Sequence, residues 1–200
     1  MGQDFSLDTD RDTDRTAPGV APRVAPGVAP GVAPGTADQD ALLTQVRRIA
    51  ETVPDPELVV VNVGDLGIVR DLRRDGTGVE IDVTPTYSAC PATLAIELAI
   101  ETAVAAAGHD VRIKRVLSPA WTTDWITPEG REKLKRAGIA PPASSRRDTG
   151  TGGYFARPTV ACPRCDSIDT TELSAFGATA CKAQYRCLAC REPFDYFKCL

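Results

Sequence analysis

Between residues 39 and 140 the chain alternates between helical and extended hydrophobic patterns. Strand-like runs cover 67–74, 79–85 and 111–117, and Asp75-Gly76-Thr77-Gly78 predicts a hairpin between the first two. Apolar residues recur at helical spacing over 41–53, after a predicted N-cap at Asp40, and over 91–107. A third helix is predicted from Thr127-Pro128-Glu129 to Gly138, and a short extended piece over 59–63. This order predicts a two-layer α+β or α/β domain, in which helices pack on a three-stranded sheet.

The remaining segments have different patterns. Residues 1–38 join an acidic start to a repeated Val-Ala-Pro-Gly unit, which excludes regular structure and predicts a disordered arm. Residues 141–158 are rich in Ser, Gly and Arg and are predicted to be a linker. The last segment, 159–200, predicts three short strands over 170–176, 178–186 and 193–198.

Two Cys-x-x-Cys pairs in this last segment carry the most specific chemistry of the chain. Cys162 and Cys165 are separated by 21 residues from Cys187 and Cys190. Each pair can present two sulfurs from one tight turn, and two such turns complete a four-cysteine zinc site. Asp166, which follows the first pair, is of a residue type that tolerates a left-handed backbone. We therefore expect a small zinc ribbon with a structural Zn²⁺; redox or disulfide pairs are the alternative.

Three further cysteines lie outside these pairs. Cys90 precedes Pro91 at the predicted start of a helix, where an N-cap position would lower the pKa of its thiol. It is a candidate for metal binding or nucleophilic chemistry, and an inert buried thiol is the alternative. Cys181 and Cys199 are candidate additional thiol ligands, as alternatives in the zinc site or in a second site with Cys90, or else they are core thiols.

The amino-acid composition argues against several classes of function for this chain. Seven cysteines and no apolar leader favour the reducing cytoplasm, and no run of residues is long and apolar enough for a membrane span. The net charge is −4, and the ribbon carries six basic and five acidic residues from Arg157 onward, so neither favours nucleic-acid binding. With one histidine and no phosphate-binding or nucleophile motif, a self-contained enzyme active site is hard to assemble.

Several motifs of the first domain resemble the MIP18 (DUF59) family. They are Asp55-Pro56-Glu57-Leu58, the run 61–69, Thr84 through Cys90-Pro91, and the run 118–127. The resemblance implies a small α/β fold and a role in the assembly and delivery of iron–sulfur clusters. It places the family's cysteine at Cys90 and its acidic motif at Asp55 and Glu57, which become candidates for holding transient iron or a cluster.

Over about 40–200, the chain is similar to the family of D subunits of bacterial phenylacetyl-CoA epoxidase systems. The later motifs of this match are Cys162-Pro163-Arg164-Cys165, the run 176–183, Tyr185-Arg186-Cys187 and the run 191–199. The resemblance implies an accessory subunit that matures the metal centres of the complex without catalysing epoxidation. Its implied partners are the oxygenase or reductase subunits, and ligation shared across a homodimer is a further hypothesis. The alternative is an integral electron-transfer or structural subunit with its own metal centre.

Overall fold

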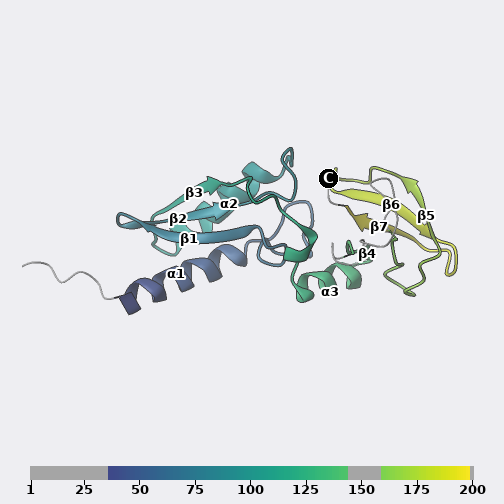
Figure 1. The fold of residues 1–200 in the computed structure, drawn as a ribbon, viewed down its shortest axis with the longest axis horizontal. Coiled ribbons are helices and arrows are strands. Elements are labelled where there is room, and N and C mark those ends of the chain that lie inside the picture. The colour runs from purple at the N-terminus through teal and green to yellow at the C-terminus, as the bar shows by residue number, and fades with distance from the viewer. Residues whose placement is uncertain (1–35, 144–158, 199–200) are drawn as a thin grey trace, which may run out of the picture. The chain divides into compact units, whose positions relative to one another are not determined.

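The structure is a computed structural model that describes residues 36–143 and 159–198. Its first half contains α1 (Thr36–Glu51), β1 (Val69–Asp75), β2 (Gly78–Val83), α2 (Thr93–Ala106) and β3 (Val111–Arg115). Next come a 3-10 helix η1 (Thr123–Trp125), α3 (Pro128–Arg136), β4 (Ile139–Ala140), β5 (Thr170–Ser174), β6 (Lys182–Cys187) and β7 (Pro193–Phe197) (Figure 1). The Val-Ala-Pro-Gly repeat, Cys199 and most of the predicted linker lie outside the described residues.

A three-stranded sheet in the order β1-β2-β3 forms the first layer of the N-terminal domain. β1 and β2 pair antiparallel through the predicted hairpin, whereas β2 and β3 run parallel, joined through α2. Helices α1 and α2 contact each other and the two outer strands, so they cover the same face (Figure 1). Ile81 of β2 is fully buried, whereas Glu80 and Asp82 on its other face pair with Arg73. The predicted two-layer fold is therefore confirmed.

Three local predictions differ from the structure. Helix α1 begins at Thr36, so Asp40 lies inside it and its carbonyl accepts a hydrogen bond from Thr44 Oγ1 at 2.8 Å. Helix α2 begins at Thr93 with Ala92 at its N-cap, so Cys90 is not the capping residue. Residues 59–63 form turns with one isolated β-bridge, from Asn62 to Pro54, instead of an extended segment. By contrast, Thr127 caps α3 as predicted, because its hydroxyl accepts the Gly130 N–H at 2.9 Å.

The second sheet has the order β4-β7-β6-β5 and forms the ribbon. The strands of the ribbon pair antiparallel as β5-β6-β7, and Tyr185 packs between Phe194 and Tyr196. β4, which directly follows α3, pairs parallel with β7. No pattern in the sequence indicated this strand, because only two residues form it.

Side chains of the ribbon complete the core of the N-terminal domain. The Phe197 ring packs edge-on against Trp121 with 6.3 Å between centroids, and the Trp121 indole N–H donates to the Leu66 carbonyl at 2.7 Å. Phe197 and Cys181 belong to the same buried cluster as Ile81.

Over the described residues, no helix is long and apolar enough to cross a membrane.

Candidate metal centre and thiol–carboxylate site

The four paired cysteines of the ribbon meet at one point. Their Sγ atoms all lie within 4.8 Å of one another, with 3.7 Å between Cys162 and Cys190 and 3.6 Å between Cys165 and Cys187. A tetrahedral ion with metal–sulfur bonds of about 2.3 Å separates neighbouring sulfurs by about 3.8 Å. The arrangement thus fits one four-thiolate ion and indicates metal binding. All four are free thiols in this structure.

Each cysteine pair has a backbone N–H directed at its first sulfur and a positive φ directly after its second cysteine. The Arg164 N–H points to Cys162 Sγ at 3.4 Å, and the Cys190 N–H points to Cys187 Sγ at the same distance. The backbone turns back through a positive φ directly after each pair, at Asp166 (58°) and Arg191 (70°). Sequence reasoning identified Asp166 but missed Arg191, because arginine rarely adopts this conformation.

The electrostatics of one thiol favour metal binding directly. The Cys190 N–H, followed by the neighbouring thiols, lowers the pKa of Cys187 to about 7. Although a backbone N–H opposes each shift, burial and the neighbouring sulfurs raise the pKa values of Cys165 and Cys190 at the same time, so the thiols act as one group whose protons a bound metal ion replaces.

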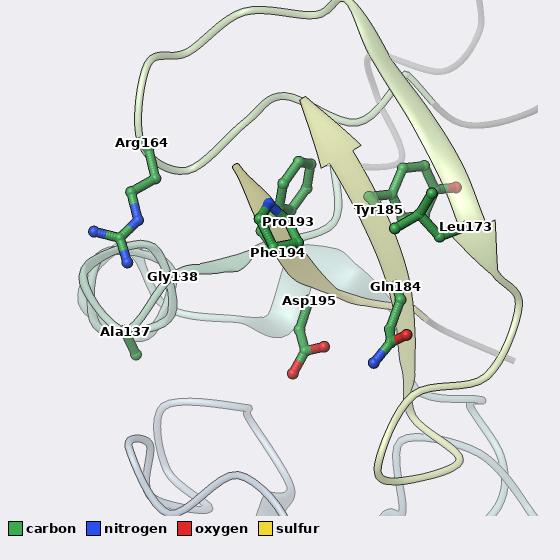
Figure 2. A pocket seen from close by; sticks show the side chains of 9 residues that line it. All are labelled: Ala137, Gly138, Arg164, Leu173, Gln184, Tyr185, Pro193, Phe194 and Asp195. Carbon is green, nitrogen blue, oxygen red and sulfur yellow. The ribbon is translucent and has the colours of Figure 1, made fainter. Parts of the chain in front are cut away.

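A polar groove of about 360 Å³ lies beside the first knuckle, Cys162–Cys165 (Figure 2). Figure 2 shows the Arg164 guanidinium directed toward Ala137 and Gly138, at the C-terminal end of α3, where helix carbonyls carry partial negative charge. Lys135 of α3 also pairs with Asp166 at 2.6 Å. None of the predicted site residues lines the groove, and the Lys135–Asp166 ion pair joins the knuckle region to α3.

The Asp55 turn is built around a buried carboxylate. Asp55 is 6% exposed, and its Oδ1 accepts the N–H groups of Glu57 at 2.8 Å and Leu58 at 2.7 Å. Burial raises the pKa of Asp55 although these two N–H groups oppose the shift. Asp55 therefore sets the direction of the loop that carries Glu57.

Cys90 lies across from this turn. A small cavity of about 10 Å³ is lined by both Cys90 and Asp55, together with residues that include Thr86 and Thr93. Burial raises the pKa of Cys90, the Ala92 N–H and Thr93 oppose the shift, and the charges of Glu57 and Asp55 add to it. The predicted lowering of this pKa was wrong. The sulfur is two residues from the N-cap, and burial beside two carboxylates outweighs the remaining N–H donation.

Cys181 reaches the same region from the ribbon. Its side chain is 4% exposed, its Sγ lies 3.5 Å from Glu57 Oε2, and Thr179 Oγ1 lies 3.1 Å from the sulfur. Burial first, and then the Glu57 charge, raise the pKa of Cys181 to about 11. Sequence reasoning named Cys181 as a candidate ligand but gave no reason to place it beside Glu57, which is 124 positions away.

Tyr87 is a fifth member of this group that the sequence did not single out. Burial raises the pKa of its phenol, and the charges of Cys90, Glu57 and Cys181 add to the shift. We call Asp55, Glu57, Tyr87, Cys90 and Cys181 the thiol–carboxylate site. Within the described residues, no ion pair joins a basic side chain to either carboxylate of this site. All five groups are neutral when protonated and negative when ionised, so none of them supplies a positive charge to the site.

Comparison with known proteins identifies both parts of the chain. The family model of an iron–sulfur cluster assembly protein matches residues 43–115, and the model of the PaaD zinc beta ribbon domain matches residues 146–198. The chain is therefore an assembly-type domain joined to a ribbon. A curated Escherichia coli (strain K12) protein described as the D subunit of 1,2-phenylacetyl-CoA epoxidase is 48% identical over 157 residues, covering 78% of this chain and 92% of the relative. The chain belongs to this family of D subunits, and the resemblance seen in the sequence is confirmed.

Two solved structures are also similar. One is a crystal structure of a DUF59 domain of unknown function from Bacillus anthracis, at 23% identity and a TM-score of 0.47, covering 50% of this chain and 97% of that one. The other is a solution structure of a Mycobacterium tuberculosis protein associated with Fe–S complex assembly and repair. It is 38% identical, with a TM-score of 0.29, and the match covers 57% of this chain and 98% of that one.

Proposed function

We propose that this chain is an accessory factor of the phenylacetyl-CoA epoxidase system that delivers iron or an iron–sulfur cluster to a partner subunit. In this proposal it does not catalyse epoxidation. The oxygenase or reductase subunit receives the cargo, and delivery takes place in the cytoplasm, where thiols stay reduced. Membership of the D-subunit family and the match to an iron–sulfur cluster assembly domain support this choice.

One observation carries the proposal. Cys90 and the buried carboxylate of Asp55 line the same cavity, beside Glu57, and no basic side chain of the described residues pairs with either carboxylate. A bound cation would be stabilised here, because it replaces the thiol protons and offsets the negative charge of the carboxylates. The raised thiol pKa makes the proton a competitor for the metal, which suits cargo that is held and then passed on.

The ribbon has a different task in this proposal. Cys162, Cys165, Cys187 and Cys190 would hold a Zn²⁺ ion, which supplies structural stability to the ribbon when bound. Four protein ligands leave no open position for chemistry. We therefore assign the ribbon's metal to folding and the transferable cargo to the thiol–carboxylate site.

A reconstitution experiment tests the delivery role. The client oxygenase and reductase are produced with the wild-type chain, with Cys90→Ser or with the control variant Leu117→Ala, whose side chain is 56% exposed. We expect Cys90→Ser to lower the iron content and the activity of a client several-fold, while the control supports both. Full client metallation with Cys90→Ser would refute the delivery role.

The alternative, an integral electron-transfer subunit, also has a structural basis. A tetrahedral four-thiolate site suits iron as well as zinc. Purified chain that is coloured and reversibly reduced would favour this alternative, whereas colourless chain with about one zinc would favour the accessory role.

A further inference from the structure

The position of Cys181 is unusual for a residue of the ribbon. It immediately precedes β6, yet its side chain is buried with the core of the N-terminal domain and not with the ribbon's own cluster of Tyr185 and Phe194. There its sulfur meets the Glu57 carboxylate at 3.5 Å. A thiol that only fills a core packs against apolar groups, so this contact calls for a chemical explanation.

The ribbon holds Cys181 firmly in this place. The Lys198 N–H donates to the Cys181 carbonyl at 2.9 Å, which ties the residue to the end of β7. Phe197 of β7 is 1% exposed and packs against Trp121. β7 also pairs with β4, the short strand that follows α3 in the sequence. The same contacts that join the ribbon to the domain thus place the thiol beside Glu57.

We propose that Cys181 is the second thiol ligand of the cargo, so that the ribbon and the N-terminal domain build the thiol–carboxylate site together. The ligand set is then the two sulfurs of Cys90 and Cys181 with the Glu57 carboxylate, and the cargo is a thiophilic divalent ion such as Fe²⁺ or the iron of a cluster. This inference rests on the proposed delivery function and names a further ligand for it.

Binding has a defined proton balance. Each neutral thiol that coordinates a divalent ion loses its proton to solvent, so two thiols release two protons and contribute two negative charges. Among the described residues, only the four ribbon cysteines are already spaced to share an ion. In this proposal the site closes on binding, when the thiols of Cys90 and Cys181 and the Glu57 carboxylate turn toward one ion.

This ligand set explains why the site can release its cargo. Two sulfurs and one carboxylate are fewer ligands than the four thiolates of an ordinary cluster, so one position stays open to a client ligand.

Titration of the zinc-loaded full chain with Co²⁺ without oxygen tests the proposal. Co²⁺ binds such sites more weakly than Zn²⁺ and does not displace the ribbon ion, and its thiolate complexes absorb through sulfur-to-metal charge transfer. The variants are Cys90→Ser, Cys181→Ser and Thr179→Ala. The last removes a hydroxyl beside Cys181 but keeps the thiol. Zinc content of about one per chain in every variant shows that the ribbon is intact.

We expect wild type to bind one extra ion and to release about two protons per ion at neutral pH. Each serine variant should halve the charge-transfer band and weaken binding by about tenfold or more, whereas Thr179→Ala should keep the band. The proton count is measured on wild type alone, so this test can be made even if Cys181→Ser fails to fold. The role of Cys181 would be overturned if Cys181→Ser kept the wild-type band and affinity, or if wild type released only about one proton per ion. If binding still depended on Cys90 in that case, the delivery function would stand. No extra ion in wild type would overturn both.

Discussion

The sulfur atoms of Cys162 and Cys190 lie 3.7 Å apart although 28 positions separate them in the chain. This contact closes the ribbon, because Cys162 belongs to the first knuckle and Cys190 to the turn between β6 and β7. Besides the sulfurs, the Leu188 N–H links the two knuckles by donating to the Asp169 carbonyl at 2.8 Å, and Cys162 and Cys187 share one small buried cluster, whereas Cys165 and Cys190 are exposed. The metal is thus expected to supply much of the ribbon's stability.

Metal removal should therefore unfold the ribbon. We expect Cys162→Ser or Cys190→Ser to lower the zinc content to less than about a tenth of wild type and to remove the slow amide exchange of β6 and β7. Metal analysis and hydrogen exchange measure these effects. Cys181→Ser is the matched control and should keep the ribbon's zinc. Unchanged protection of β6 after chelation would show that the ribbon folds without metal.

Alkaline pH should weaken the fold through Cys181. Its pKa is raised to about 11 in the folded chain, above the ordinary thiol value near 9, so the folded state holds the proton more tightly than the unfolded state does. The stabilisation is complete below about pH 9 and is lost as pH rises to about 11, by roughly 2 kcal/mol. Urea unfolding at several pH values measures this loss. Cys181→Ser, which has no thiol to titrate, should lose less stability over the same range, and an equal loss in both would contradict the assignment.

Phe197 should couple the ribbon to the N-terminal domain. Phe197→Ala removes a ring that is 1% exposed and contacts Trp121, so we expect a loss of about 3–5 kcal/mol in the free energy of unfolding. The matched control is Phe176→Ala, whose ring is 65% exposed and contacts Lys198, with an expected loss of about 1 kcal/mol or less. Similar losses from both variants, measured by denaturant unfolding, would show that the two parts fold without this contact.

Two glycines with positive φ should respond differently to substitution. At Gly67 (65°) an added Cβ would lie 2.6 Å from the Trp125 carbonyl oxygen, whereas at Gly76 (60°) in the hairpin it would meet no atom within 4 Å. Gly76→Ala should cost about 1 kcal/mol for the backbone conformation alone. Gly67→Ala should cost at least about 2 kcal/mol more, because the backbone near η1 must move. Thermal unfolding of both variants tests this difference, and equal losses would contradict the close approach.

Local sequence signals predicted most of the fold. The hairpin at Gly76, the cap at Thr127 and the knuckle turn at Asp166 each depend on a few adjacent residues with known backbone preferences, and all three are present in the structure. The paired cysteines were also predicted to meet, since their spacing constrains them.

The sequence-based predictions failed where a residue's surroundings are formed by segments that lie far away in the sequence. The pKa of Cys90 was predicted from its place in the sequence, but burial near Asp55 and Glu57 reverses the shift. No sequence pattern could place Cys181 beside Glu57, because that contact depends on how Phe197 docks against the N-terminal domain. Tertiary burial, which local patterns do not encode, decides both.

The central claim is that Cys90 belongs to a site for transferable iron, separate from the ribbon's structural metal. Metal analysis of the full chain purified without oxygen tests it most directly, with wild type and Cys90→Ser treated alike. We predict about one zinc per chain in both proteins, with additional iron in wild type only. Equal iron in the two proteins, or no iron beyond the ribbon's metal in wild type, would contradict the claim and leave Cys90 with a structural role.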